Sequence, residues 1–123
     1  MPRALAEVRR SRKDRDRYIA EATEYGHCSE IAASKKVNAA YHRLAAVRRR
    51  MRAGSDQGES ILVDLVNHSN RWVRLWAATD LLPLRAELAS SALEELASGP
   101  PGELRLDAEM VLKEWRVGRL KVP

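Results

Sequence analysis

The fold is decided by residues 62–82, which read LVDLVNHSNRWVRLWAATDLL. An apolar helical stretch ends there in a polar turn, and a second helical stretch follows it. The small pair Ala77 and Ala78 lets two helices approach closely, while Val73 and Leu81 fill the seam between them. One such pair of helices cannot bury both of its faces alone, so we expect neighbouring helices to stack on it.

Apolar residues at spacings of three and four predict helices along the rest of the chain, and no stretch alternates with period two. Gly26 is expected to end the first helix, and Pro83 to end the fourth. The stripe expected to be buried on the fifth helix comprises Leu88, Ala92, Leu93 and Leu96. The six expected helices cover about residues 2–24, 29 or 34–52, 57–66, 71–82, 85–98 and 102–115. Short connections between them indicate antiparallel neighbours.

With 123 residues, the chain is of a size that forms one domain with one core. Its single cysteine, Cys28, cannot form an internal disulfide. No run of about 18 apolar residues is present, and no apolar stretch follows the basic N-terminus as it does in a secretory signal. We therefore expect a protein without a membrane span, located in the cytoplasm.

Charge is unevenly distributed. Residues 1–54 contain 14 Lys/Arg and 6 Asp/Glu, a balance of +8, and residues 55–123 contain 8 and 11, a balance of −3. The basic run at residues 9–17 has three interpretations: a solvated helix face, a phosphate contact for nucleic acid, or a docking surface for an acidic partner. Against nucleic acid, Asp14 and Asp16 dilute the run and no aromatic residue interleaves with it. The candidates for electrostatic docking are Arg9, Arg10, Arg12 and Arg15.

Catalytic and metal-binding patterns are weak. Asp64, His68 and Ser69 could form part of a triad, but the first two are simply i and i+4 at a helix end and the third is a turn residue. His27, Cys28 and His42 contain no pair with a metal-ligand spacing. No glycine-rich phosphate loop is present. We therefore expect no enzymatic activity, no cofactor and no metal.

Several short motifs carry a resemblance to a known family. They are Tyr41-His42-Arg43-Leu44, His68 with Asn70, Val73-Arg74 followed by Ala77-Ala78, Leu93-Glu94-Glu95-Leu96-Ala97, and Asp107-Ala108 with Met110 and Leu112. In this order, over residues 38–113, the chain resembles a family of short bacterial proteins with a HEAT-like fold, classed as a domain of unknown function. Some members are encoded beside polymorphic or contact-dependent toxins and are regarded as immunity proteins.

The resemblance implies an all-α superhelix of HEAT type in a single domain, 1–123. The basic N-terminal helix would be 1–28, the HEAT-like helices 29–115 and a tail 116–123. One departure concerns Asn67, which stands where the family favours Asp as partner of the helix-four arginine. Arg74 would then need another acceptor, for which Asp64, Asp107 and a backbone carbonyl are candidates.

The resemblance further implies a protein that binds and occludes a cognate protein toxin. The alternative is a small HEAT-type nucleic-acid-binding protein that uses its basic N-terminal helices, and a third hypothesis is an adaptor in a larger assembly. Trp72 and Trp76 are either partial core or exposed anchors on one edge of the fourth helix, since Trp and Arg are frequent interface hot spots. The predicted partner-binding residues are Arg71, Trp72, Trp76, Asp80, Glu109 and Trp115.

Overall fold

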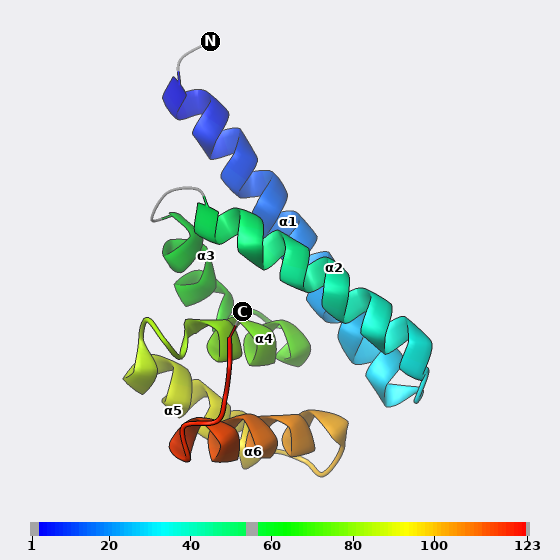
Figure 1. Cartoon of the computed structure of the whole chain (residues 1–123). Helices are drawn as coiled ribbons and strands as arrows, with labels where there is room; N and C mark the ends of the chain where they lie inside the picture. Colours follow the sequence, from blue (N-terminus) through cyan, green and yellow to red (C-terminus); the bar gives the residue numbers. More distant parts are fainter. Residues whose placement is uncertain (1–2, 54–56, 123) are drawn as a thin grey trace. The chain divides into compact units, whose positions relative to one another are not determined.

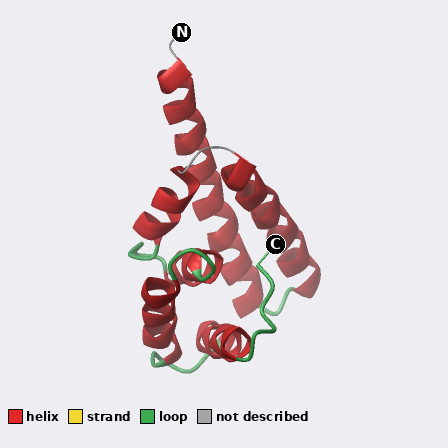
Figure 2. Cartoon of the chain, turned by 60° about the vertical axis from the view of Figure 1, so that its left-hand side comes forward, coloured by secondary structure: helices red, strands yellow, loops and turns green. Residues whose placement is uncertain are grey.

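The computed structural model describes residues 3–53 and 57–122, and within these ranges the chain is all-helical, without a strand (Figure 1, Figure 2). The all-α class predicted from the apolar periodicity is confirmed. The stacking of the helices as a HEAT-type superhelix stays a prediction. The helices are α1 (Arg3–Glu30), α2 (Ser34–Ala53), α3 (Gln57–Leu65), α4 (Arg71–Leu81), α5 (Ala86–Ala97) and α6 (Glu103–Arg116).

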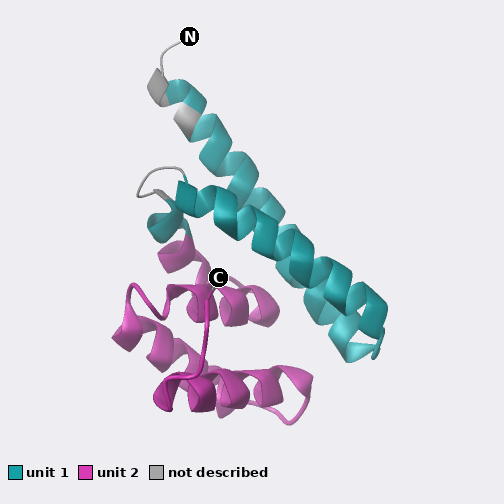
Figure 3. Cartoon of the chain, in the orientation of Figure 1, with its two compact units in different colours: residues 1–61 teal, residues 62–123 magenta. Residues whose placement is uncertain are grey.

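The chain divides into two compact units, residues 1–61 and residues 62–123 (Figure 3). The boundary falls inside α3, whereas the sequence suggested divisions after residues 28 and 115. The grouping of the whole chain into one domain stays a prediction. Each unit has its own buried residues and is described separately.

The first unit is a helical hairpin of α1 and α2. Tyr18 and Ala22 of α1 and Leu44 of α2 are fully buried, because the apolar stripes of the two helices face each other. Two ion pairs cross the seam: Arg43 Nε lies 2.9 Å from a carboxylate oxygen of Glu21, and Arg50 Nη2 lies 3.2 Å from Asp14 Oδ1. Both pairs match an antiparallel arrangement, in which residue numbers rise on one helix as they fall on the other.

The prediction that Gly26 ends the first helix is wrong, since α1 continues to Glu30. Gly26 is buried, and tertiary packing outweighs the cost of about 1 kcal/mol that glycine brings to a helix interior. The helix ends instead in a Schellman motif, in which Ala33 N donates to Cys28 O and Ala32 N to Ser29 O. Ala32 takes the left-handed position with φ of 55°, so the hairpin turns within three residues.

The second unit is organised around α4. Asn70 caps the N-terminus of α4, because its Oδ1 accepts hydrogen bonds from the amides of Trp72 and Val73. α4 contacts both α5 and α6, and eight of its 11 residues are buried. The fully buried alanines include Ala77 and Ala78, as the small pair in the sequence predicts.

α5 and α6 pack against each other within this unit, and a hydrogen bond of 2.9 Å links them, from Arg116 Nη2 at the end of α6 to Glu94 Oε1 in the last turn of α5. The stripe predicted on α5 is wrong at Leu88, which is 40% exposed. Leu93 and Leu96 are buried as predicted, Ala92 is half-buried, and Ala89 takes the buried position expected for Leu88. The predicted buried stripe therefore began one residue too early, at Leu88 in place of Ala89. One residue corresponds to a rotation of about 100° around the helix axis.

Candidate partner-binding surface

The exposure expected for two of the predicted partner-binding residues on α4 is wrong. Trp72 is 6% exposed and Asp80 is 3% exposed. The reason is the position of α4, which contacts both α5 and α6 and has eight of its 11 residues buried, so it offers no continuous exposed edge. Trp76 and Arg71 are half-buried. The straight stripe of Trp72, Trp76 and Asp80 predicted from their spacing therefore does not form an exposed binding face.

The two arginines of α4 have different surroundings. The guanidinium of Arg71 lies against Gly99 in the α5–α6 connection, where even a Cβ atom would collide with it. Arg74 Nε is buried and has no hydrogen-bond partner among the described residues. We expected Asp64, Asp107 or a backbone carbonyl to accept a hydrogen bond from Arg74. For the Nε–H group of Arg74 this expectation is wrong. Arg71 packs against the α5–α6 connection inside the second unit, so its guanidinium does not extend into solvent as an interface residue would.

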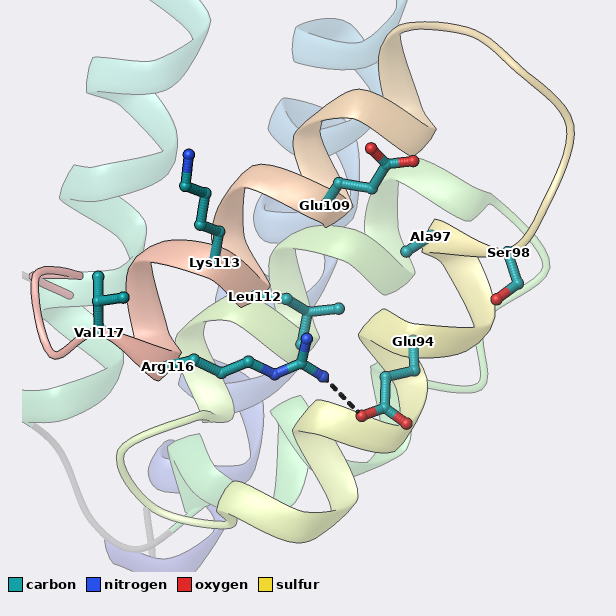
Figure 4. Close-up of a pocket in the computed structure, with 8 residues that line it drawn as sticks. All are labelled: Glu94, Ala97, Ser98, Glu109, Leu112, Lys113, Arg116 and Val117. Atoms are coloured by element: carbon teal, nitrogen blue, oxygen red, sulfur yellow. Dashed lines mark hydrogen bonds and ion pairs between the residues drawn. The ribbon is translucent and has the colours of Figure 1, made fainter.

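An open hollow lies between α5 and α6, with a volume of about 630 Å³. Arg116 reaches from α6 to Glu94 on α5, and Leu112 points toward α5 (Figure 4). Glu109, predicted as a partner-binding residue, lines the hollow and accepts a hydrogen bond of 2.9 Å from Arg105 Nε. The lining residues are Glu94, Ala97, Ser98, Glu109, Leu112, Lys113, Arg116 and Val117.

A second row of apolar side chains runs along α6 and its C-cap beside this hollow. Leu106 is 58% exposed, Met110 59% and Val117 56%. At i, i+4 and i+11 these residues share one face of a helix of 3.6 residues per turn. We call this row the α6 apolar stripe. Lys113 and Glu114 lie between Met110 and Val117, so charged residues interrupt the row. Exposed apolar side chains among charged ones are typical of a protein interaction site.

Sequence reasoning missed the α6 apolar stripe, although its spacing was visible. The sequence pattern of α6 predicts one apolar face formed by Leu104, Ala108, Val111 or Leu112, and Trp115. Of these residues, Leu104, Ala108 and Leu112 are buried. Trp115, predicted as a partner-binding residue, is half-buried. The structure therefore brings Glu109 of the predicted set to the hollow and leaves Trp115 at the edge of the core.

Asp107, on α6, has an elevated pKa of about 6, because burial disfavours its charge and Glu103 adds like-charge repulsion. With a folded-state pKa above the ordinary 3.8, the folded chain holds the proton more tightly than the unfolded chain between these values. The stabilising effect of this proton is present at low pH and is lost as the pH rises through about 6.

Asp107→Asn is therefore expected to raise the urea midpoint at pH 7, because the variant has no carboxylate charge to desolvate. The advantage over the original chain should shrink as the pH falls from 7 to 4, where Asp107 itself becomes neutral. Urea unfolding of both chains across this range measures the difference. An advantage that is constant with pH would contradict the elevated pKa.

The electrostatic docking candidates belong to the first unit. Arg9, Arg10 and Arg12 are exposed on α1, and Arg15 is half-buried.

Among residues 3–53 and 57–122, no group of three His, Cys, Asp or Glu side chains is placed to hold a metal ion. Over the same part of the chain, no helix has the length and apolar character needed to cross a membrane. Comparisons of the chain with family models, with curated proteins and with solved structures each gave no match.

Proposed function

We propose that the protein is a non-enzymatic binding module whose protein partner docks on the α6 apolar stripe and the adjoining hollow. The observation that carries the proposal is the exposure of Leu106, Met110 and Val117 in one row. Burial of this row in a complex would remove apolar surface from water at about 25 cal/mol per Å². Methionine suits such a surface because its flexible thioether adapts to the partner.

The rim of the surface favours a partner with charges of both signs. Glu94 and Glu109 supply carboxylates, and Lys113 and Arg116 supply cations around the same hollow. Arg116 already pairs with Glu94 at the surface, and exposed pairs of this kind contribute only about 0–1 kcal/mol. A partner can therefore exchange this internal pair for its own charges at little cost.

The resemblance to the bacterial HEAT-like family supports a cognate toxin as the partner. In this proposal the chain acts as an immunity protein in the cytoplasm of the producing cell. It blocks the toxin by covering it, with no bond made or broken. The stripe supplies the apolar centre of the interface and the charged hollow supplies its rim, which is the usual division of roles.

Deletion of the gene is expected to stop growth only while a neighbouring toxin gene is intact. A plasmid copy of the original chain should restore growth, whereas a copy with Leu106→Asp and Met110→Asp should not. Each charged residue placed in the centre of an interface is expected to cost about 2 kcal/mol or more of binding energy. Colony counts after plasmid exchange measure the outcome.

The matched control is Leu84→Asp, because Leu84 is also 58% exposed but lies before α5, outside the stripe. This variant should protect as well as the original chain. Equal protection by the stripe variant would place the partner elsewhere on the protein. Normal growth of the deletion strain in the presence of an active toxin would overturn the immunity proposal.

A further inference from the structure

α2 is a helix of 20 residues that contains seven Lys/Arg and no Asp or Glu. Apart from Arg52, its exposed basic residues fall into three adjacent pairs, each seven positions after the previous one. We call them together the α2 basic stripe: Lys35, Lys36, His42, Arg43, Arg49 and Arg50. All six side chains are exposed.

Seven residues make about two turns of an α-helix, so the pairs recur on one face of α2. The rise between neighbouring pairs is about 10.5 Å, and the first and last pairs are about 21 Å apart. Leu44 and Val47 lie on the buried side of α2. The stripe is consequently a row on the exposed side of the hairpin in which five of the six residues are Lys or Arg.

Carboxylates of the first unit neutralise the stripe only in part. Glu21 pairs with Arg43, and Asp14 pairs with Arg50. Within the described residues, no carboxylate forms an ion pair with Lys35, Lys36 or Arg49. A row of like charges destabilises the compact state through self-repulsion, and an external row of anions would relieve it.

We propose that the α2 basic stripe binds the phosphate backbone of double-stranded DNA without sequence preference. Each DNA strand carries a phosphate about every 3.4 Å along the axis, so about six phosphates of one strand fall within the stripe's length of about 21 Å. Because the strand winds around the axis, a straight row contacts only some of them, about four. The diameter of an α-helix with side chains, about 10–12 Å, matches a major groove about 12 Å wide. This surface is separate from the α6 apolar stripe and does not depend on the proposed toxin partner.

Two features select duplex DNA over other nucleic acids. Single strands are bound by stacking bases on exposed aromatic rings, but Tyr41, the only tyrosine or tryptophan of α2, is half-buried, with its ring edge-on to His42 at 5.6 Å. Duplex RNA has a deep, narrow major groove that does not admit protein side chains. The backbone of B-form DNA is the polyanion that a broad helical row of cations fits best.

The test is the fluorescence anisotropy of a labelled DNA duplex of about 20 bp, titrated with the full chain at 50–200 mM salt. About four phosphate contacts predict a slope of log K against log salt near −3.6, a loss of about 100-fold in affinity over this range. Lys35→Ala with Lys36→Ala should make the slope shallower by about 1.8, because two contacts are removed.

The matched control is Arg119→Ala with Lys121→Ala, which removes the same net charge from exposed positions of the second unit. This control should retain the affinity and the slope of the original chain. Equal weakening by both double variants would show a general charge effect and overturn the assignment to α2. Absence of binding at 50 mM salt, or tighter binding of single-stranded DNA, duplex RNA or polyglutamate, would also overturn it.

Discussion

Replacing Trp72 by alanine is expected to lower the free energy of unfolding by about 3–5 kcal/mol. Trp72 is 6% exposed on α4, so its removal leaves a large cavity in a closely packed region. Urea unfolding followed by circular dichroism measures the change, with the midpoint falling at an unaltered slope. Leu106→Ala serves as the control, because this exposed side chain should alter stability by no more than about 0.5 kcal/mol.

The same measurement separates the two interpretations of the tryptophans. A Trp72→Ala chain with unchanged stability would return this residue to the binding surface. Asp80→Lys is expected to destabilise as well, because Asp80 is 3% exposed and a buried lysine needs a partner for its charge. Loss of partner binding by either variant would then report unfolding, so it would not identify a contact.

Replacing Leu44 by alanine is expected to cost about 2–5 kcal/mol, this time in the first unit. Leu44 is fully buried in the α1–α2 hairpin, where its side chain fills the seam between the helices. Differential scanning calorimetry measures the fall in melting temperature. Val8→Ala on α1 is the control, because Val8 is 48% exposed and its truncation leaves no enclosed cavity. An equal fall in both variants would contradict the hairpin core.

The effects of Leu44→Ala and Trp72→Ala also report on the two compact units. If the chain unfolds in one step, both substitutions shift the same transition. If it unfolds in two steps, each substitution shifts the transition of its own unit. Calorimetry of the double variant therefore shows how strongly the units cooperate.

Helices α3 to α6 could be predicted to within about a residue, because apolar periodicity and the breaks at Asn70 and Pro83 act locally. The start of α2 was left between residues 29 and 34, and the helix begins at Ser34. The C-terminal end of α1 could not. Gly26 is an ordinary stop signal, but here it is buried inside the hairpin, and the turn uses Ala32 in a conformation that glycine normally takes. Packing between residues far apart in the sequence therefore determines the conformation at both Gly26 and Ala32.

The candidate surface was harder to predict than the fold. Periodicity identifies the line of a helix that faces the core, but it does not say how many neighbours surround that helix. For this reason the burial of Trp72 and Asp80 on α4 could not be predicted from the sequence. On α6 two apolar lines are present, and only the contacts with α4 and α5 show that Leu106 and Met110 belong to the outer one.

The two ion pairs of the hairpin have a consequence for the register in which α1 and α2 align. Asp14 and Glu21 are seven residues apart, and so are their partners Arg50 and Arg43. Sliding one helix along the other by a single turn, about 5.4 Å, would separate both pairs at once. The fully buried Tyr18, Ala22 and Leu44 would also lose their packing in such a slide. The charges act together with this packing to fix one alignment, as complementary charges do beside the seam of a coiled coil.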